Sequence, residues 1–374
     1  MTDSRTHPAT ATRVRHRRRM SGAGARRPWG SVVAAVVLLA CALLVVATSG
    51  WGSWGSNRGS ADGPSAKAIT AAPSPTSGGR AAADTATTPS GLPWRSGATD
   101  TGDSFAGWRG RPLDVAITFE NDGTWKGTEV VWALEDGTLA DFKGKLSIAV
   151  PMLSNRNDTF QQCAAGAYDS HFHALGNTLK KYGREDSYIR LGWEGNGDWM
   201  AWSANGNTAV WKACFRREVQ ALRSVAPGVQ IDWNMNKDGD TSAIDLYPGD
   251  DVVDVIGVDY YSMWPGLNSK STWDRTYMQS ESNHSPVGIG AWLAFARAHG
   301  KKLSVPEWGV NNGGGGGGGD DAAYIQFMYN FFKANASQIA YEGYFNSQCP
   351  NYCILPSGKN PQASAKYRQL WASK

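Results

Sequence analysis

The chain has 374 residues, of which 41% are hydrophobic and 19% are charged, and a formal net charge of +4 at pH 7. The positive charge belongs to the N-terminus, since residues 1–30 carry eight arginines against one acid and the remaining chain sums to −3 (+4 minus +7). A nucleic-acid interface is excluded because this basic run leads directly into an apolar segment.

The N-terminal third indicates an exported protein. Residues 1–30 form a basic n-region or cytoplasmic flank, and residues 31–49 form a signal peptide or a membrane anchor, both of which remain open. The positive flank keeps the N-terminus inside and places the rest of the chain outside. Residues 50–92, rich in Gly, Ser, Ala, Thr and Pro, predict a flexible linker. We therefore expect a secreted or membrane-anchored protein whose working domain is extracellular.

From residue 93 to residue 374 the composition predicts one globular domain in which strands and helices alternate. The helices are expected at 168–182, 208–222, 289–298 and 322–332, each with apolar residues three or four apart. The strands are expected at 113–119, 146–152, 188–193, 229–235, 252–258, 302–307 and 339–345. Such alternation indicates parallel βα units, an α/β fold.

Two strands end in a glutamate. Glu194 follows strand 188–193, and glycines 195 and 197 then break the chain. Three indoles crowd this carboxyl and should raise its pKa, as a general acid requires: Trp193, Trp199 and Trp202. The alternative is an ordinary surface Glu beside core tryptophans. Glu307 ends strand 302–307 in the same way, which favours a pair of catalytic carboxylates.

These motifs make the chain from about Phe105 onward similar to the family 26 glycoside hydrolases, whose best known members are β-mannanases. The resemblance is carried by Arg190, by Trp193-Glu194-Gly195-Asn196-Gly197 with Trp199, and by Glu307-Trp308-Gly309. It implies a (β/α)8 TIM barrel, with Glu194 as acid/base, Glu307 as nucleophile, and Tyr261 and Arg190 orienting the nucleophile. One position departs from the family pattern, because Trp193 stands where mannanases usually carry His.

The resemblance and the tryptophans near strand ends give a set of candidate substrate-binding residues. They are Trp193, Asn196, Trp199, Trp202, Tyr260, Tyr261, Trp264 and Trp308. The expected partner is a polysaccharide, with no nucleic acid, no cofactor and no metal. We expect a monomer that touches a membrane only through residues 31–47, if these are not cleaved.

Four cysteines follow the leader, and their pairing is open in principle. We favour a disulfide between Cys163 and Cys214, which lie on or near neighbouring helices, and a second between Cys349 and Cys353. The glycine run Gly313–Gly319 is interpreted either as a mobile flap over a cleft or as a tolerant surface loop.

The predicted function is a retaining endo-β-glycanase acting on mannan first, with β-glucan and β-xylan as alternatives. Two other hypotheses remain: a hydrolase that trims the producer's own exopolysaccharide, and a non-catalytic glycan-binding protein on the same barrel.

Overall fold

A computed structural model of the chain describes residues 88–99, 104–120, 123–155, 157–313, 316–347 and 353–372. The predicted leader, the anchor and most of the linker lie outside these residues. Within the described ranges, no helix combines the length and apolar character needed to cross a membrane.

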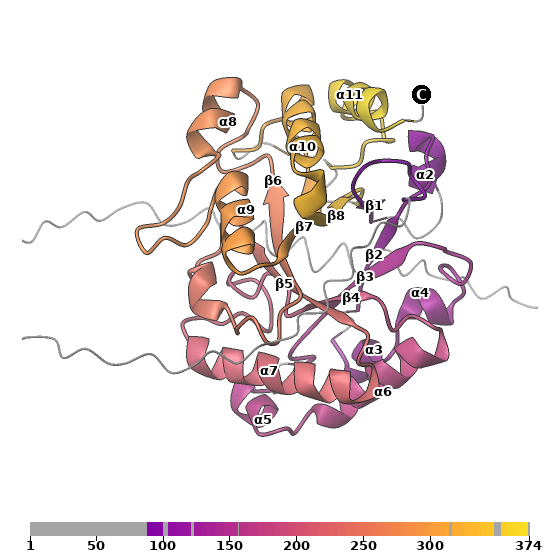
Figure 1. The fold of residues 1–374 in the computed structure, drawn as a ribbon, viewed down its shortest axis with the longest axis vertical. Coiled ribbons are helices and arrows are strands. Elements are labelled where there is room, and N and C mark those ends of the chain that lie inside the picture. Colours follow the sequence, from indigo (N-terminus) through magenta and orange to yellow (C-terminus); the bar gives the residue numbers. More distant parts are fainter. Residues whose placement is uncertain are drawn as a thin grey trace, which may run out of the picture.

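Eight parallel strands close into a barrel in chain order, each hydrogen-bonded to the next and the last to the first (Figure 1). The strands are β1 (Ser96–Ala98), β2 (Val115–Phe119), β3 (Lys145–Val150), β4 (Tyr188–Leu191), β5 (Gln230–Asn236), β6 (Val255–Tyr261), β7 (Lys302–Gly309) and β8 (Ile339–Tyr344). The predicted (β/α)8 barrel is confirmed.

Helices surround the strands on the outside (Figure 1). They are α2 (Ser104–Arg109), α3 (Trp125–Glu129), α4 (Trp132–Glu135), α5 (Phe160–Ala164), α6 (Asp169–Lys181), α7 (Thr208–Val225), α8 (Lys270–Thr276), α9 (Ile289–Ala298), α10 (Ala322–Ala334) and α11 (Pro361–Trp371), with short 3-10 turns at Ala243–Leu246 and Ala336–Gln338. The four helices expected from apolar periodicity are all present, as α6, α7, α9 and α10.

Seven strands lie where short apolar runs predicted them, although β6 begins three residues later than expected. Strand β1 was not predicted from the sequence, because its three residues, Ser-Gly-Ala, carry no β-branched or aromatic side chain. Gly97 is needed in β1, since a Cβ there would lie 2.3 Å from the carbonyl oxygen of Val115 on β2. This close approach helps the barrel to close.

The domain begins earlier than residue 93. The backbone N–H and Oγ of Ser90 donate to the carboxylate of Asp114 at 2.7 and 2.5 Å, and Leu92 is buried. Residues 88–92, assigned to the linker from their composition, therefore pack on the barrel. Composition alone does not reveal such side-chain to backbone contacts.

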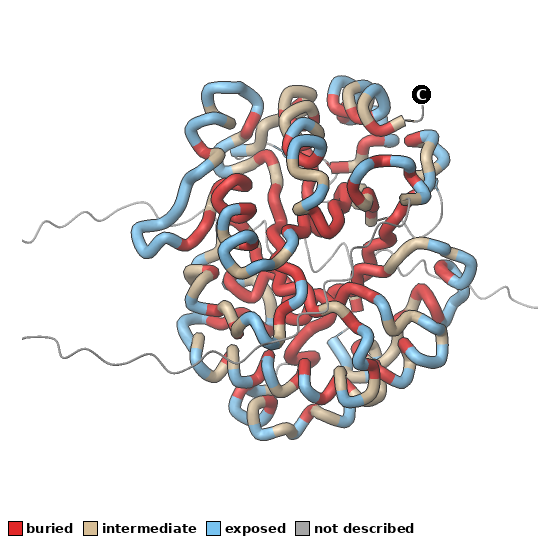
Figure 2. The backbone as a smooth tube through the Cα atoms, in the orientation of Figure 1, coloured by how far each residue is buried: buried red, intermediate tan, exposed pale blue. Residues whose placement is uncertain are grey.

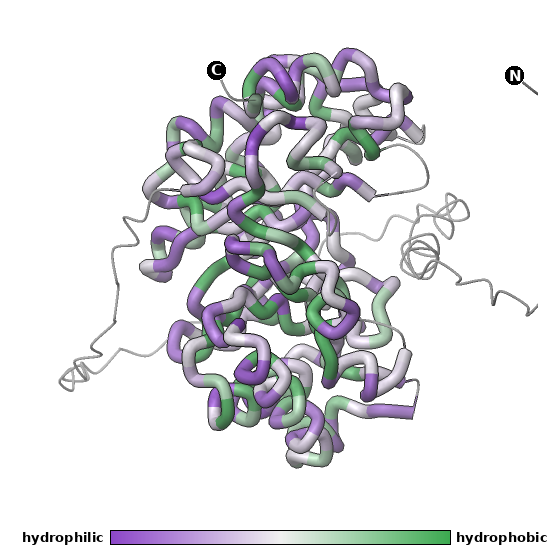
Figure 3. The backbone as a smooth tube through the Cα atoms, turned by 90° about the vertical axis from the view of Figure 1, so that its right-hand side faces the viewer, coloured by the Kyte–Doolittle hydropathy of each residue, from purple (hydrophilic) through white to green (hydrophobic). Residues whose placement is uncertain are grey.

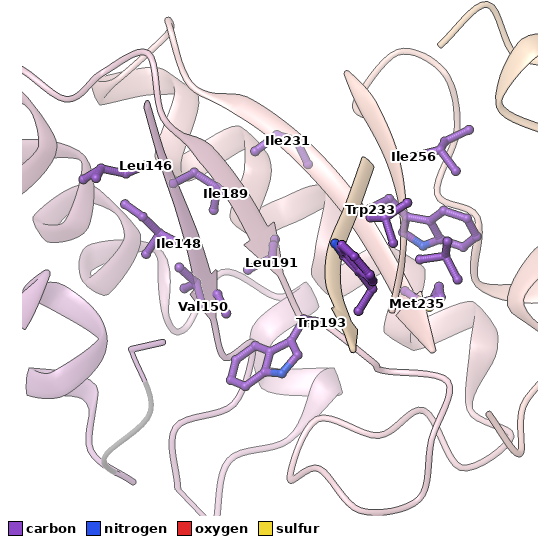
Figure 4. Close-up of a cluster of buried hydrophobic side chains, with 14 of the residues drawn as sticks. Leu146, Ile148, Val150, Ile189, Leu191, Trp193, Ile231, Trp233, Met235 and Ile256 are labelled. Atoms are coloured by element: carbon purple, nitrogen blue, oxygen red, sulfur yellow. The ribbon is translucent and has the colours of Figure 1, made fainter. Parts of the chain in front are cut away.

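Side chains alternate along the strands between two buried environments. Apolar residues such as Leu146, Ile189 and Ile231 join the layer beneath the helices (Figure 4). The residues between them are polar and equally buried: Ser147, Arg190, Asp232, Asn234 and Ser304. Figure 2 shows the strands at the centre as buried and much of the surrounding chain as exposed, and Figure 3 shows hydrophobic and hydrophilic residues interspersed along the backbone. The period of two thus places a polar network inside the barrel.

A disulfide joins Cys163 on α5 to Cys214 on α7, as predicted. Cys349 lies outside the described residues, so the second expected pairing stays a prediction. Cys353 itself is fully buried.

Candidate active site

Glu194 is placed by a sharp turn at the end of β4. It adopts a left-handed backbone conformation with φ of 52°, and its N–H donates to the carbonyl of Asn234 at 2.9 Å. Flanking glycines make the turn possible, because a Cβ on Gly192 would lie 2.4 Å from the sulfur of Met152. Left-handed backbone is costly for a residue other than glycine, and such strain is concentrated at functional sites.

The carboxylate of Glu194 is 8% exposed and accepts two hydrogen bonds. Asn236 Nδ2 donates to Oε1 at 2.6 Å, and Trp199 Nε1 donates to Oε2 at 2.9 Å. Burial, and then the charge of Glu307, raise the pKa of Glu194 to about 7, while the two hydrogen bonds act in the opposite direction. The predicted rise is present, but Trp199 counteracts it by stabilising the ionised form.

Glu307, in β7, is held by two donors. Tyr261 Oη donates to Oε2 at 2.9 Å, and the guanidinium of Arg190 binds Oε1. Arg190 is fully buried, and its Nε donates to Asn234 Oδ1 at 2.9 Å. The contacts expected between Tyr261, Arg190 and the second carboxylate are therefore confirmed.

A third carboxylate, Asp259 on β6, completes the cluster and was missed from the sequence. It accepts from Asn234 Nδ2 at 3.0 Å and from Arg190 Nη2 at 3.4 Å. Burial, and then the charge of Glu307, raise the pKa of Asp259 well above its usual value. Asp259 could have been identified from the sequence, because Asp259 and Tyr261 lie two residues apart in a strand and their side chains must face the same side.

The three carboxylates converge on one point. One carboxylate oxygen from each of Glu194, Asp259 and Glu307 lies within 4.8 Å of the other two. Oxygens at this spacing could ligate a divalent cation. However, Arg190 already contacts two of the three groups and supplies the compensating charge. The donor set therefore favours a guanidinium-paired carboxylate cluster over a metal centre.

The distance between Glu194 and Glu307 is relevant to the stereochemistry of glycoside hydrolysis. Retaining glycosidases hold their two carboxyls about 5–5.5 Å apart, whereas inverting enzymes need about 6.5–9.5 Å to admit a water. One carboxylate oxygen of Glu194 lies within 4.8 Å of one carboxylate oxygen of Glu307, so the two groups are close enough to act on one glycosidic bond. Two strand-end carboxylates, one with a raised pKa and one bound by cationic and phenolic donors, form a pair that can share acid and nucleophile roles.

Comparisons with known proteins agree with this geometry. Residues 184–279, which include Arg190, Glu194, Asp259 and Tyr261, match the profile of glycosyl hydrolase family 26. The chain resembles this family over that segment. A β-1,3-xylanase from Vibrio sp is 30% identical over 130 residues, and one from Alcaligenes sp is 31% identical over 130 residues; each match covers 32% of this chain and 27% of the relative. The chain thus aligns with about a quarter of the length of these curated relatives.

Solved structures extend the likeness over the barrel. A family 26 β-mannanase from Bacteroides ovatus superposes with a TM-score of 0.52 at 15% identity, covering 74% of this chain and 85% of that one. The catalytic domain of an endo-β-1,4-mannanase from Bacillus sp. JAMB-750 gives a TM-score of 0.54 at 17% identity, covering 77% and 88%. At these identities the match establishes the shared fold.

Four of the residues predicted to bind substrate have other contacts in this barrel. Trp308 is fully buried on the helix side of β7, where its Nε1 donates to Glu342 Oε2 at 2.6 Å. Tyr260 is 2% exposed and faces away from Tyr261. Both follow from strand alternation, since their neighbours Glu307 and Tyr261 point inward.

The other two support the loop around Glu194. Trp202 is buried against Trp193, with ring centroids 4.3 Å apart. The side chain of Asn196 is occupied by the backbone of Asn236, donating to its carbonyl at 2.7 Å and accepting from its N–H at 2.9 Å. Asn196 thereby positions Asn236, which in turn binds Glu194.

Aromatic side chains form a wall beside the carboxylates. Phe119 makes edge contacts with Trp193 and Phe345, at centroid distances of 5.9 and 6.1 Å, and Phe345 meets Tyr261 at 5.9 Å. The guanidinium of Arg190 lies 5.3 Å from the ring of Phe119. The two phenylalanines were not singled out from the sequence, although both lie at strand ends. An apolar wall lowers the local polarity and strengthens the charge interactions within it.

Proposed function

We propose that the protein is a retaining endo-β-glycanase that hydrolyses a neutral β-linked polysaccharide by double displacement. The observation that carries the proposal is the approach of Glu194 and Glu307 within 4.8 Å, with the pKa of Glu194 raised to about 7. A carboxyl with a pKa near neutral pH, next to a second carboxyl group, meets the requirements of the retaining mechanism.

In the first step, a carboxylate oxygen of Glu307 attacks the anomeric carbon while Glu194 gives its proton to the leaving glycosidic oxygen. The glycosidic bond breaks, and a glycosyl ester forms on Glu307. In the second step, Glu194 takes a proton from water, and the hydroxide attacks the same carbon. The sugar leaves with its original configuration, Glu307 is again a carboxylate, and Glu194 is again protonated.

Tyr261 and Arg190 serve the nucleophile in this scheme. Both donate to Glu307, so they fix the orientation of its carboxylate oxygens. Asp259 shares Arg190 with Glu307, which ties the guanidinium into one geometry. Asn236 stabilises Glu194 after it has lost its proton.

The substrate is proposed as mannan or xylan. Mannan is supported by the β-mannanases that share this barrel, and xylan by the β-1,3-xylanases that align with part of the chain. The wall of Phe119, Trp193 and Phe345 offers no hydrogen-bond donor or acceptor apart from the indole N–H. A neutral sugar suits this wall better than a charged one.

The test is hydrolysis by the full chain of β-1,4-mannan, β-1,3-xylan, β-1,4-xylan and mixed-linkage β-glucan, with reducing ends counted. Glu194→Gln and Glu307→Gln should abolish release, whereas Glu135→Gln, at an exposed position on α4, should not. Proton NMR of the first product should show the β-anomer. Appearance of the α-anomer first would refute the double displacement.

The same panel separates the rival hypotheses. If the folded protein retards a polymer in an affinity gel without cleaving any, a glycan-binding protein is supported instead. Cleavage of the producer's own exopolysaccharide, with no cleavage of the plant or algal polymers, supports the trimming hydrolase.

We also propose that the protein is secreted or anchored with this barrel outside the cell, and acts as a monomer. The disulfide between Cys163 and Cys214 supports an oxidising compartment. Cell fractionation with an antibody to the barrel tests the location.

A further inference from the structure

Trp264 stands out among the described residues because it is 54% exposed, and the only other large apolar side chain so exposed is Met278. It lies three residues after Tyr261, on the loop that follows β6. Its φ is 56°, in the left-handed region that a bulky side chain rarely occupies. A strained and exposed tryptophan beside the nucleophile's partner indicates a function rather than a packing role.

The six-membered ring of the indole lies against the glycine run. A Cβ added to Gly316 would lie 2.7 Å from Trp264 Cε3 and 2.8 Å from Cζ3, so the backbone itself lies against the ring. Trp264 N donates to the carbonyl of Gly316 at 3.2 Å, and Gly318 N donates to the carbonyl of Ser262 at 2.8 Å. Met263 and Gly317 form an antiparallel bridge between these bonds.

The glycines are required by this contact. A Cβ on Gly266 would lie 2.6 Å from the Cα of Gly318, and one on Gly318 would lie 2.3 Å from Ser262 Oγ. The interpretation of the run as a tolerant surface loop is therefore wrong for residues 316–318. The flap interpretation stays a prediction.

Two further contacts hold the indole at a set position relative to the carboxylates. Lys237 Nζ donates to the carbonyl of Met263 at 2.8 Å, and Lys237 directly follows Asn236, which binds Glu194. Ser262 Oγ donates to Asp321 Oδ2 at 2.8 Å, which joins the loop to the start of α10. A ring held in this way loses little freedom when a ligand stacks on it.

We propose that Trp264, backed by Gly316–Gly318, is a sugar-stacking platform that binds a pyranose unit of the polymer at some distance from the bond being cleaved. The six-membered ring of the indole lies against Gly316, and the exposed part of the side chain, 54% of it, presents an apolar, electron-rich surface. The apolar C–H face of a neutral β-linked pyranose is complementary to such a surface. The proposal rests on the proposed function for the identity of its ligand, but it concerns binding and is measured without turnover.

The binding test uses Glu307→Gln as the parent, so that no polymer is cleaved during affinity electrophoresis. The gels contain β-1,4-mannan, β-1,3-xylan, β-1,4-xylan or mixed-linkage β-glucan. Adding Trp264→Ala should weaken retardation roughly tenfold, the loss expected when about 50 Å² of apolar ring surface is no longer buried. Trp264→Phe should fall between the two, and Met278→Ala, at the other exposed apolar side chain, should bind as the parent does.

Gly316→Ala tests the backing without changing the indole. It should weaken binding in the same direction as Trp264→Ala, because the added methyl displaces the ring and φ is 95° at this position. Thermal melting of each variant checks that the barrel remains folded. Unchanged retardation in Trp264→Ala overturns the proposal, and so does a parent that binds none of the four polymers.

Kinetics separate the platform from the catalytic centre. In the otherwise wild-type chain, Trp264→Ala should raise KM for the polymer roughly tenfold, with a smaller effect on kcat. The same variant should lose less kcat/KM on a short aryl glycoside than on the polymer. An equal loss on the short substrate would place Trp264 at the cleavage point and overturn the distal platform. If the wild-type protein cleaves none of the polymers, the proposed function is refuted. The binding gels still test whether Trp264 binds sugar.

Discussion

Replacing Glu194 by Gln should stabilise the protein increasingly as the pH rises. Burial and the charge of Glu307 raise the pKa of this carboxyl from its ordinary value of 4.5 to about 7. A group whose pKa is raised on folding stabilises the native state fully below its unfolded pKa, and this contribution is lost as the pH rises through the folded pKa. The wild type therefore loses stability between about pH 4.5 and pH 7, a loss that glutamine, which does not ionise, avoids.

The size of the effect follows from the two pKa values. Moving a carboxyl from 4.5 to about 7 corresponds to about 3 kcal/mol of free energy of unfolding at alkaline pH. For a domain of this size, that difference shifts Tm by about 6–9 °C. Glutamine also weakens one of the two hydrogen bonds from Asn236 and Trp199, but this cost does not depend on pH. The informative quantity is therefore the change of the Tm difference with pH.

Differential scanning calorimetry of wild type and Glu194→Gln at pH 5, 6, 7, 8 and 9 measures this difference. It should grow steadily in favour of the variant up to about pH 8 and then level off. Glu135→Gln, at an exposed position on α4, is the matched control and should give a flat line. A flat line for Glu194→Gln as well would refute the raised pKa, and with it the assignment of Glu194 as the proton donor.

Three other substitutions test the contacts around the carboxylates and the disulfide. Asn236→Ala removes a hydrogen bond that lowers the pKa of Glu194, so the alkaline limb of kcat/KM should move up by about half to one pH unit; a downward move would contradict this account. Tyr261→Phe removes the phenol that donates to Glu307 and should lower kcat/KM about 10–100-fold, with the fold checked by circular dichroism. Replacing both Cys163 and Cys214 by Ala opens a bridge between residues 51 apart and should cost about 4 kcal/mol in urea unfolding, with kcat at 25 °C unaltered; an unchanged urea midpoint would show that the bridge does not stabilise the fold.

Strand alternation explains where the structure places the residues of the predicted site. Glu194 and Glu307 were recognisable because each ends a short apolar run and is followed by glycine within two residues. Trp308 and Tyr260 were assigned to the cleft because they flank those motifs. Neighbours in a strand face opposite sides, however, so an inward Glu307 puts Trp308 under the helices, where it is fully buried.

Local sequence was sufficient for the elements whose pattern is complete within a few residues. Apolar spacing predicted α9 at its observed bounds, and the four-helix and seven-strand pattern was enough to indicate parallel βα units. These elements depend on periodicity and propensity, which act over one or two turns of helix or one strand. The eight-stranded barrel was instead implied by the resemblance to the family 26 glycoside hydrolases.

Tertiary structure decided the partnerships between distant residues. Arg190 meets Glu307 across 117 residues, and Asp259 joins them from a third strand, so no local window contains the cluster. The contact of Trp264 with Gly316 likewise requires two loops to meet, and the pairing of β6 with β7 brings them together. The pKa of Glu194 also depends on the tertiary fold, since burial and the nearby Glu307 charge, its two main causes, exist only in the folded chain.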